Sequence, residues 1–369
     1  YYVKVVFRVD ASINIGTGHV MRCLTLAKAL INQHTQVEFI CREHRGHLID
    51  YIKESGFNVH SLPIENETEK NHFTRPGKTE KSLFHSAWLG VSQQQDAIDC
   101  LPILDKVQPN WLIVDHYAID QQWQAELKPY YHKLMVIDDI ADRQHLCDIL
   151  LDQTYGDTPE KYAGLVPQNC TLLMGTQYAL LRPEFAQWRE LSLKRREQIA
   201  LNHLLITLGG IDVDNVTSAV LLALQSCKLP EKLKITVVMG ANAPHLQAVT
   251  ELAEQMSCEL NLQVNIKVNV ANMAELMANA DLAIGGSGST SWERCCLGLP
   301  TLVIVLAENQ KGIAKNLKKA GAATVLEMNE LDKFYTSFED LMQNRQAITL
   351  ASSNIVDGQG VARVIEKLQ

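Results

Sequence analysis

Short apolar runs rich in Val, Ile and Leu alternate with helix-like patterns along almost the whole chain. This alternation constrains the fold most strongly, because it is typical of βαβ units that build parallel sheets covered by helices on both faces. Seven runs in the first part predict strands at residues 4–9, 36–42, 58–63, 111–117, 133–139, 149–153 and 171–176. Five more predict strands at residues 203–210, 234–240, 264–270, 281–288 and 301–306. The sequence therefore predicts an α/β protein.

The length of 369 residues favours two domains over one. A charged segment that contains Pro183 and few strand signals separates the two series of strands. We therefore expect two Rossmann-like domains with parallel sheets facing an interdomain cleft, where ligands sit at the carboxyl ends of strands. The expected bounds are an N-terminal domain at 1–182, a linker at 183–202, a C-terminal domain at 203–350, and a C-terminal helix at 351–369 that could pack back on the first domain.

One stretch, Glu65 to Gly90, interrupts the alternation with polar residues and a Pro-Gly pair. It predicts a long surface loop, of a length that is usually functional or disordered.

Composition and charge exclude several classes of protein. The formal net charge is −8 and basic residues are not clustered, which argues against nucleic-acid binding. The first residues predict a strand and not a signal peptide, and no apolar run approaches the roughly 18–20 residues that span a bilayer. Nine cysteines without a CxxC motif indicate reduced thiols and no metal site. We expect a cytoplasmic protein without membrane contact.

Glycine-rich turns follow three of the predicted strands. Gly16 and Gly18 precede a helix, and Gly209 and Gly210 end a later strand. Glycine lets a turn adopt positive φ and lets a ligand approach the backbone, while the start of a helix attracts anions. The first turn lacks the third glycine of the dinucleotide fingerprint, so an ordinary tight βα turn explains it equally well.

The third turn carries the stronger signal. It joins a predicted buried strand to a helix and consists of small and hydroxyl-bearing residues, which suits an anion-binding nest. Its residues are Gly285, Gly286, Ser287, Gly288, Ser289, Thr290 and Ser291. No Gly-Lys-Ser/Thr motif occurs, so this is not a P-loop. Glu293, one helical turn further, either accepts hydrogen bonds from a ribose diol or is a solvated surface residue.

His19 follows the first glycine turn directly. In the first turn of a helix, the positive end of the helix dipole disfavours imidazolium, which leaves the neutral ring that a general base requires. The alternative is that His19 only packs against the turn or caps it. Asp10, at the end of the first predicted strand, is the nearest candidate in sequence to orient the imidazole, although a carboxylate there also suits a helix cap.

Two other strand ends carry polar residues. Asp115, His116 and Tyr117 end one predicted strand, and Asp138 and Asp139 end the next. The two neighbouring aspartates could be acid/base groups or metal ligands. Without a third clustered ligand, turn capping is the better interpretation of them, and of Arg143 nearby.

With these residues in hand, the chain resembles the UDP-sugar hydrolases of pseudaminic acid biosynthesis, which remove UDP from UDP-2,4-diacetamido-2,4,6-trideoxy-β-L-altropyranose. The stretches that carry the resemblance span nearly the whole chain, and they include "RVDASINIGTGHVMRCLTLAKAL", "WLIVDHYAID", "LITLGGIDVDN" and "AIGGSGSTSWERCCLGLPTLVIVLAENQ". The stretches of the second half are shared with the wider GT-B glycosyltransferases, such as the lipid II-forming N-acetylglucosaminyltransferase.

The resemblance implies a GT-B fold and a reaction without metal or cofactor. His19 is then the base that activates water to attack the anomeric carbon, with inversion, and Tyr117 lies near the sugar or the water. In the second half, the resemblance implies UDP-binding roles for a larger set of residues. They are Gly209, Gly210, Val270, Met273, Gly286, Ser287, Gly288, Ser289, Thr290, Glu293, Asn309 and Gln310, with Val270 and Met273 against the uracil.

Three alternatives stay open at this stage. They are a GT-B glycosyltransferase that uses a UDP-amino sugar, a hydrolysing sugar-nucleotide epimerase, and a nucleotide-sugar-binding protein without catalysis. A membrane-bound acceptor would call for a hydrophobic or basic rim, and no such stretch occurs. The expected partners are therefore a small UDP-sugar and water, and a monomer is the default expectation for the chain.

Overall fold

The first strand, β1 (Lys4–Val9), shows why the sheet that contains it is covered on both faces. Val5, Phe7 and Val9 are buried in one apolar cluster together with residues of helices α1 (Gly18–Ile31) and α12 (Gly360–Leu368). Val6 belongs to a second cluster that contains residues of helix α3 (Gln93–Val107). Successive side chains of a strand point to opposite faces, so the two clusters are the two helical layers over one sheet.

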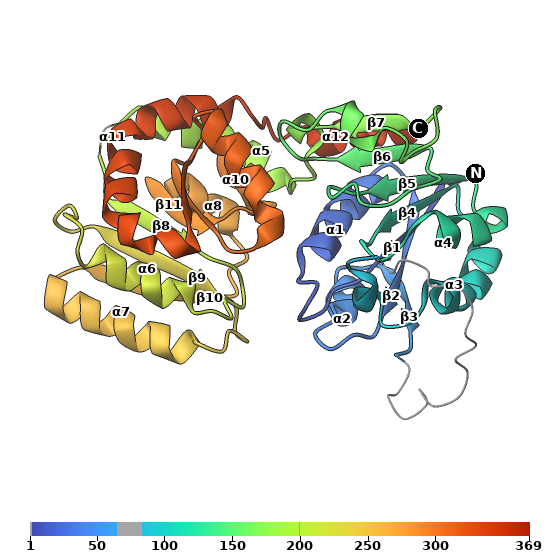
Figure 1. The fold of residues 1–369 in the computed structure, drawn as a ribbon, viewed down its shortest axis with the longest axis horizontal. Coiled ribbons are helices and arrows are strands. Elements are labelled where there is room, and N and C mark those ends of the chain that lie inside the picture. Colours follow the sequence, from blue (N-terminus) through green and yellow to red (C-terminus); the bar gives the residue numbers. More distant parts are fainter. Residues whose placement is uncertain (1, 65–82, 199) are drawn as a thin grey trace. The chain divides into compact units, whose positions relative to one another are not determined.

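The first sheet has seven parallel strands in the order β3-β2-β1-β4-β5-β6-β7 (Figure 1). The further strands are β2 (Gln36–Arg42), β3 (Asn58–Leu62), β4 (Trp111–Asp115), β5 (Lys133–Ile137), β6 (Ile149–Asp152) and β7 (Thr171–Met174). The shorter helices are α2 (Ile49–Glu54), α4 (Gln121–Glu126), η2 (Ser86–Leu89), η3 (Lys128–Tyr130), η4 (Pro159–Tyr162) and η5 (Thr176–Tyr178).

The second sheet has six parallel strands in the order β10-β9-β8-β11-β12-β13. They are β8 (His203–Thr207), β9 (Lys234–Met239), β10 (Gln263–Val268), β11 (Leu282–Gly286), β12 (Thr301–Val305) and β13 (Thr324–Glu327). The helices are α5 (Pro183–Arg195), α6 (Val216–Leu224), α7 (Leu246–Leu260), α8 (Met273–Asn279), α9 (Thr290–Cys296), η6 (Glu308–Gln310), α10 (Lys311–Lys319), η7 (Met328–Lys333) and α11 (Phe334–Ser353).

In each sheet the strand that comes first in the chain, β1 or β8, lies near the middle. The strand order reverses beside it, between β1 and β4 in the first sheet and between β8 and β11 in the second. This is the doubly wound order, in which ligands bind outside the carboxyl ends of the strands at the reversal. The predicted α/β class with parallel sheets is confirmed, and all twelve predicted strands lie within one or a few residues of an observed one.

The computed structural model describes residues 2–64, 83–198 and 200–369, and these fall into two units. One unit runs to Leu180 and also contains Gly360–Gln369, while the other is Leu181–Gln359. Most of the segment expected to be a linker at 183–202 is helix α5, which belongs to the second unit. Ser192 of this helix donates to the carbonyl of Leu297 at 2.7 Å, so the helix is tied into that unit and is not a free connection.

The end of the chain, expected as one helix at 351–369, is divided. Helix α11 reaches Ser353, and α12 belongs to the first unit, where the Trp111 indole N–H donates to the carbonyl of Leu368 at 2.9 Å. Of the expected surface loop at Glu65–Gly90, residues 65–82 lie outside the described residues. The remainder contains the short helix η2.

Candidate functional site

The carboxyl ends of β1 and β4 bring several of the predicted polar residues together in the first unit. Val9 pairs with Asp115 in the parallel register, so these two side chains share a sheet face, the one that α1 covers. Asp10, the next residue along, accepts a 2.6 Å hydrogen bond from Arg8, whose side chain points to the opposite face. The pleat of the strands therefore decides which carboxylate meets helix α1.

His19 lies in the first turn of α1, and its Nδ1 is 2.6 Å from Oδ1 of Asp115. The structure thus corrects the expectation that Asp10 orients this imidazole. A carboxylate only accepts hydrogen bonds, so this contact requires the proton on Nδ1, and in the neutral ring the lone pair is then on Nε2. The His19 side chain is 11% exposed, while Asp115 is fully buried.

Arg22 holds the Asp115 carboxylate from the next turn of the same helix. Its Nε lies 2.6 Å from Oδ2 and its Nη2 2.7 Å from Oδ1, which is a bidentate pair. Burial opposes ionisation of Asp115, but Arg22 and His19 outweigh it and lower the pKa of this carboxyl well below its usual range. Asp115 is therefore an anion that fixes the ring of His19. Sequence analysis missed Arg22, although its spacing of three from His19 places both on one helix face.

Asp10 is also a buried anion, but its partners are different. It accepts hydrogen bonds from Arg8 at 2.6 Å, from the backbone N–H of Arg42 at 2.7 Å, and from His116 Nε2 at 3.1 Å. Burial opposes ionisation, yet Arg8 and the histidine hydrogen bonds lower the pKa of Asp10 well below its usual range. Asp10 thus joins the ends of β1, β2 and β4.

Tyr117 lies beside His19, with ring centroids 4.7 Å apart and the rings nearly perpendicular. Its hydroxyl donates to Asp139, and Asp139 is also 3.6 Å from Nη1 of Arg22. Burial and the Asp139 charge raise the pKa of Tyr117 well above its usual range, so the phenol keeps its proton. Asp139 thereby contacts the candidate site, which the turn-capping interpretation did not foresee.

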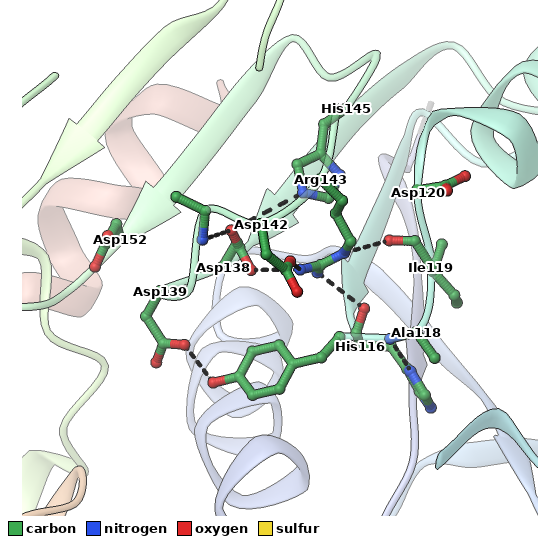
Figure 2. Close-up of polar contacts among 12 residues, drawn as sticks. His116, Ala118, Ile119, Asp120, Asp138, Asp139, Asp142, Arg143, His145 and Asp152 are labelled. Atoms are coloured by element: carbon green, nitrogen blue, oxygen red, sulfur yellow. Dashed lines mark hydrogen bonds and ion pairs between the residues drawn. The ribbon is translucent and has the colours of Figure 1, made fainter. Parts of the chain in front are cut away.

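Asp138 does cap a turn, as expected. It accepts from the backbone N–H of Ala141 at 3.0 Å and from Arg143 Nη1 at 3.0 Å. Arg143 also donates to the carbonyls of Ile119 and His116, which joins the loop after β4 to the loop after β5 (Figure 2).

A narrow recess, partly open to solvent, lies at this strand edge. Its lining residues are Asp10, Ile15, His19, Trp88, Asp115, His116 and Tyr117. The loop before α1 forms one side of it. Gly16 has φ +79°, which favours glycine, and its N–H donates to the carbonyl of Ser12 at 2.8 Å; Gly18 is the first residue of α1. Trp88 was not singled out from the sequence, because it follows a polar stretch without strand or helix pattern.

In the second unit, the turn between β11 and α9 is built over a buried arginine. Arg294 donates from Nη2 to the carbonyl of Gly286 at 2.5 Å and to Ser291 Oγ at 3.2 Å, and from Nη1 to Thr290 Oγ1 at 3.2 Å. A Cβ at Gly285 would lie 2.5 Å from Nη1, so the guanidinium requires glycine there. Burial lowers the pKa of Arg294 to about 10, and the group is still a cation at neutral pH. A positive charge therefore lies beneath the predicted anion-binding turn.

Gln310 holds the same turn from the end of β12. Its Oε1 accepts from the backbone N–H of Leu306 at 3.1 Å and of Ser287 at 3.3 Å, and its backbone carbonyl accepts from Ser287 Oγ at 3.1 Å. Ser287 is fully buried, whereas Gly288, Ser289 and Thr290 line the outer side of the turn with intermediate or full exposure.

Glu293 lies on α9 with its side chain 20% exposed, 4.0 Å from Nη2 of Arg182. Burial raises the pKa of Glu293 to about 7, although Arg182 and Arg294 both favour the ionised form. The solvated-surface alternative for this residue does not fit its environment.

The other residues expected to bind UDP follow carboxyl ends of the second sheet. Gly209 and Gly210 follow β8, Val270 and Met273 connect β10 to α8, and Asn309 is exposed in η6 after β12. Because all six strands are parallel, these residues share the sheet edge that carries the Gly286–Ser291 turn.

No group of three or more His, Cys, Asp or Glu side chains in residues 2–64, 83–198 and 200–369 is arranged to hold a metal ion. Within the same ranges, no helix combines the length and the apolar character needed to cross a membrane.

Comparison with known sequences finds similarity in the second half of the chain and along most of its length. Residues 203–368 match the glycosyltransferase family 28 C-terminal domain. The UDP-2,4-diacetamido-2,4,6-trideoxy-beta-L-altropyranose hydrolase of Campylobacter jejuni is 27% identical over 86% of this chain and 97% of its own length. The spore coat polysaccharide biosynthesis protein SpsG of Bacillus subtilis is 29% identical over 60% of this chain and 64% of its own length.

Solved structures agree on the fold. MurG of Acinetobacter baumannii aligns with 100% of this chain and 99% of its own, with a TM-score of 0.69 and 14% identity. The UDP-GlcNAc 2-epimerase of Neisseria meningitidis aligns over 100% and 99%, with a TM-score of 0.61 and 12% identity. The chain is therefore an α/β protein of GT-B fold whose residues 203–368 match the glycosyltransferase family 28 C-terminal domain, and it is similar along most of its length to a UDP-sugar hydrolase.

Proposed function

We propose that this protein hydrolyses UDP-2,4-diacetamido-2,4,6-trideoxy-β-L-altropyranose to UDP and the free sugar. The observation that carries the proposal is the 2.6 Å contact between His19 Nδ1 and the buried Asp115 carboxylate, which leaves Nε2 as a general base. The similarity over 86% of the chain to a hydrolase named for this substrate supports the choice of reaction.

In the proposed reaction, His19 Nε2 accepts a proton from a water molecule while the water oxygen bonds to the anomeric carbon. The bond between that carbon and the diphosphate oxygen breaks, its electron pair stays on UDP, and the sugar is released with inverted anomeric configuration. Asp115 stabilises the imidazolium that forms, because a buried carboxylate 2.6 Å away is already ionised. Tyr117 borders the same recess, and its hydroxyl oxygen can accept a hydrogen bond from the sugar or the water.

The second unit binds the UDP part in this proposal. The Gly286–Ser291 turn and the buried Arg294 charge face the diphosphate, which stabilises the departing anion. Glu293 accepts hydrogen bonds from the ribose hydroxyls, and Val270 and Met273 border the uracil. UDP leaves as an anion, so the step needs no acid to protonate the leaving oxygen, in contrast to most glycosidases.

The test is incubation of the protein with this UDP-sugar in EDTA, without any acceptor, followed by proton NMR. We expect UDP release and first appearance of the inverted anomer of the unchanged sugar. Release of a sugar altered at C2 would instead identify an epimerase. No release without an acceptor would contradict hydrolysis and favour the glycosyltransferase alternative.

A further inference from the structure

Three aromatic rings lie against one another at the edge of the recess that contains His19. The ring centroids of His85 and Trp88 are 4.4 Å apart, those of His85 and Tyr117 5.3 Å, and those of Trp88 and Tyr117 5.7 Å with an interplanar angle of 26°. We call these three residues the aromatic wall. Two of them come from the segment at helix η2, and the third follows β4.

The aromatic wall is continuous with the candidate base. Trp88 and Tyr117 line the recess together with His19, whose ring meets Tyr117 edge-on at 4.7 Å. On the outer side, Phe84 is 90% exposed and its ring centroid is 4.9 Å from that of His85. An aromatic surface therefore extends from the proposed reacting atoms outward.

The partly exposed rings of the wall are those of His85 and Trp88, because Tyr117 is buried and has the Arg143 guanidinium 5.7 Å from its ring centroid. The Tyr117 hydroxyl donates to Asp139, and burial and Asp139 raise the pKa of this phenol, so the ring stays neutral. Partial burial lowers the pKa of His85, and Arg143 and His19 act in the same direction, which outweighs the opposite effect of Asp142 and Asp139. Such a surface suits aliphatic C–H groups, because a polar hydroxyl placed against it would lose hydrogen bonds to water.

We propose that the aromatic wall binds the methyl group at C5 of the sugar and thereby selects 6-deoxy sugars over sugars with a 6-hydroxyl. The inference rests on the proposed function, which places the sugar beside His19. It adds Trp88 and His85 to the site as specificity-determining residues.

The test measures binding in the His19→Asn background, so that the UDP-sugar stays intact during the measurement. Dissociation constants are determined for UDP, for UDP-2,4-diacetamido-2,4,6-trideoxy-β-L-altropyranose and for UDP-N-acetylglucosamine, with and without Trp88→Ala. We expect Trp88→Ala to weaken binding of the deoxy sugar nucleotide by about fivefold and to leave binding of UDP unchanged. The preference for the deoxy compound over UDP-N-acetylglucosamine should fall by the same factor.

Two further variants sharpen the result. Trp88→Phe should retain most of the affinity, because a ring remains in place. Phe84→Ala is the matched control, an exposed aromatic residue of the same segment whose ring contacts that of His85. If Trp88→Ala fails to fold, His85→Ala provides the same comparison.

Equal affinity of the deoxy sugar nucleotide with and without Trp88 would overturn the inference, as would an equal loss for UDP. The result of this binding test does not depend on whether the protein hydrolyses the UDP-sugar. A wild type that binds the deoxy sugar nucleotide through Trp88 but releases no UDP would contradict hydrolysis and leave the aromatic wall supported.

Discussion

At the scale of single residues, the pairing of His19 with Asp115 explains why a histidine stands at the start of α1. The glycine turn and the helix start predicted an uncharged base with Asp10, the nearest strand-end aspartate in sequence, as its partner, whereas the structure has Asp115. The choice between them depends on which sheet face each side chain takes, and this requires the register of β1 against β4. A single sequence does not contain that register, so Asp115 could not be identified in advance.

Asp115→Asn tests the proposed role of this carboxylate. The amide can donate to Nδ1 as well as accept from it, so the correct tautomer of His19 is no longer enforced. We expect kcat to fall by about 10²–10⁴-fold, the usual contribution of a general base. UDP affinity should stay within twofold of the wild-type value.

The same change removes the bidentate carboxylate partner of Arg22 and leaves it the more distant Asp139, 3.6 Å away, and breaking a buried ion pair typically costs about 3–5 kcal/mol. The kinetic comparison therefore belongs at a temperature at which circular dichroism shows the variant to be folded. A folded Asp115→Asn variant with wild-type kcat would show that His19 does not depend on this carboxylate.

Glu293→Gln tests a second residue through its pH dependence. The folded protein holds the Glu293 proton up to about pH 7, whereas the ordinary value is 4.5. Between these values the native state binds more protons than the unfolded chain, so the free energy of unfolding falls as the pH rises. Glutamine removes this effect, and we expect the variant to melt at a higher temperature than wild type at pH 8 and at an equal temperature near pH 4.5.

The stabilised variant should nevertheless bind UDP more weakly at pH 8, because the carboxylate that accepts from the ribose is gone. Calorimetric titration with UDP at pH 6 and pH 8 measures this, with wild type losing affinity at the lower pH. Unchanged UDP affinity in Glu293→Gln at pH 8 would argue against contact with the ribose.

At the scale of helices and strands, the sequence patterns predicted nearly all of the strands that are covered by helices on both faces of a sheet. Twelve strands could be predicted because continuous Val, Ile and Leu runs are bounded by turn residues. β13 (Thr324–Glu327) was missed, since it is a four-residue strand at the edge of its sheet and only Leu326 is fully buried. Helix α5 was taken for a linker because its surface is mostly charged and only Phe185 and Ser192 are buried.

The site residues missed from sequence share another property. Arg22, Arg294 and Trp88 act through contacts with residues that are remote in sequence or with backbone carbonyls. Nothing in the residue types nearby distinguishes them from ordinary charged or aromatic positions. The strand-end motifs predicted where the sites lie, but they did not predict the side chains that contact and position the site residues.

Gly360→Ala tests how closely α12 packs in the first unit. A Cβ at Gly360 would lie 2.2 Å from the carbonyl oxygen of Ala179 and 2.5 Å from its nitrogen, and both are backbone atoms that cannot turn away. We expect this variant to lose about 1–3 kcal/mol of unfolding free energy, as overpacked sites do. Denaturant unfolding gives the value.

Gly312→Ala is the matched control in helix α10, where an added Cβ would meet no atom within 4 Å. Alanine suits a helix better than glycine, so this variant should be as stable as wild type or more stable by up to about 1 kcal/mol. A Gly360→Ala variant as stable as this control would show that α12 is not packed as described.

At the scale of the whole molecule, the chain passes from the first unit to the second after Leu180 and returns at Gly360. The first unit is therefore completed by the last residues of the chain. Val364, Ile365 and Leu368 of α12 are buried in the apolar cluster of β1 and α1. The parallel sheets of both units were predictable from the strand pattern. That the C-terminal helix belongs to the first unit was only one possibility from the sequence.

Truncation after Gln359 tests this organisation. Removal of α12 exposes the apolar cluster and removes the acceptor of the Trp111 indole N–H. We expect trypsin to cleave the truncated protein faster within residues 2–180, while cleavage within 181–359 is unchanged, as followed by mass spectrometry. Uniformly faster cleavage of both regions would contradict the assignment of α12 to the first unit.

The central claim is that His19 acts as a base in the release of UDP from a UDP-linked sugar. The most direct measurement compares wild type, His19→Asn and the control His34→Asn, an exposed histidine with positive φ that asparagine tolerates. Release of UDP from UDP-2,4-diacetamido-2,4,6-trideoxy-β-L-altropyranose is followed in EDTA, and UDP affinity is measured in parallel. We predict that His19→Asn lowers kcat by about 10²–10⁴-fold with unchanged UDP affinity, while His34→Asn matches wild type. A His19→Asn variant that releases UDP at the wild-type rate would contradict the account.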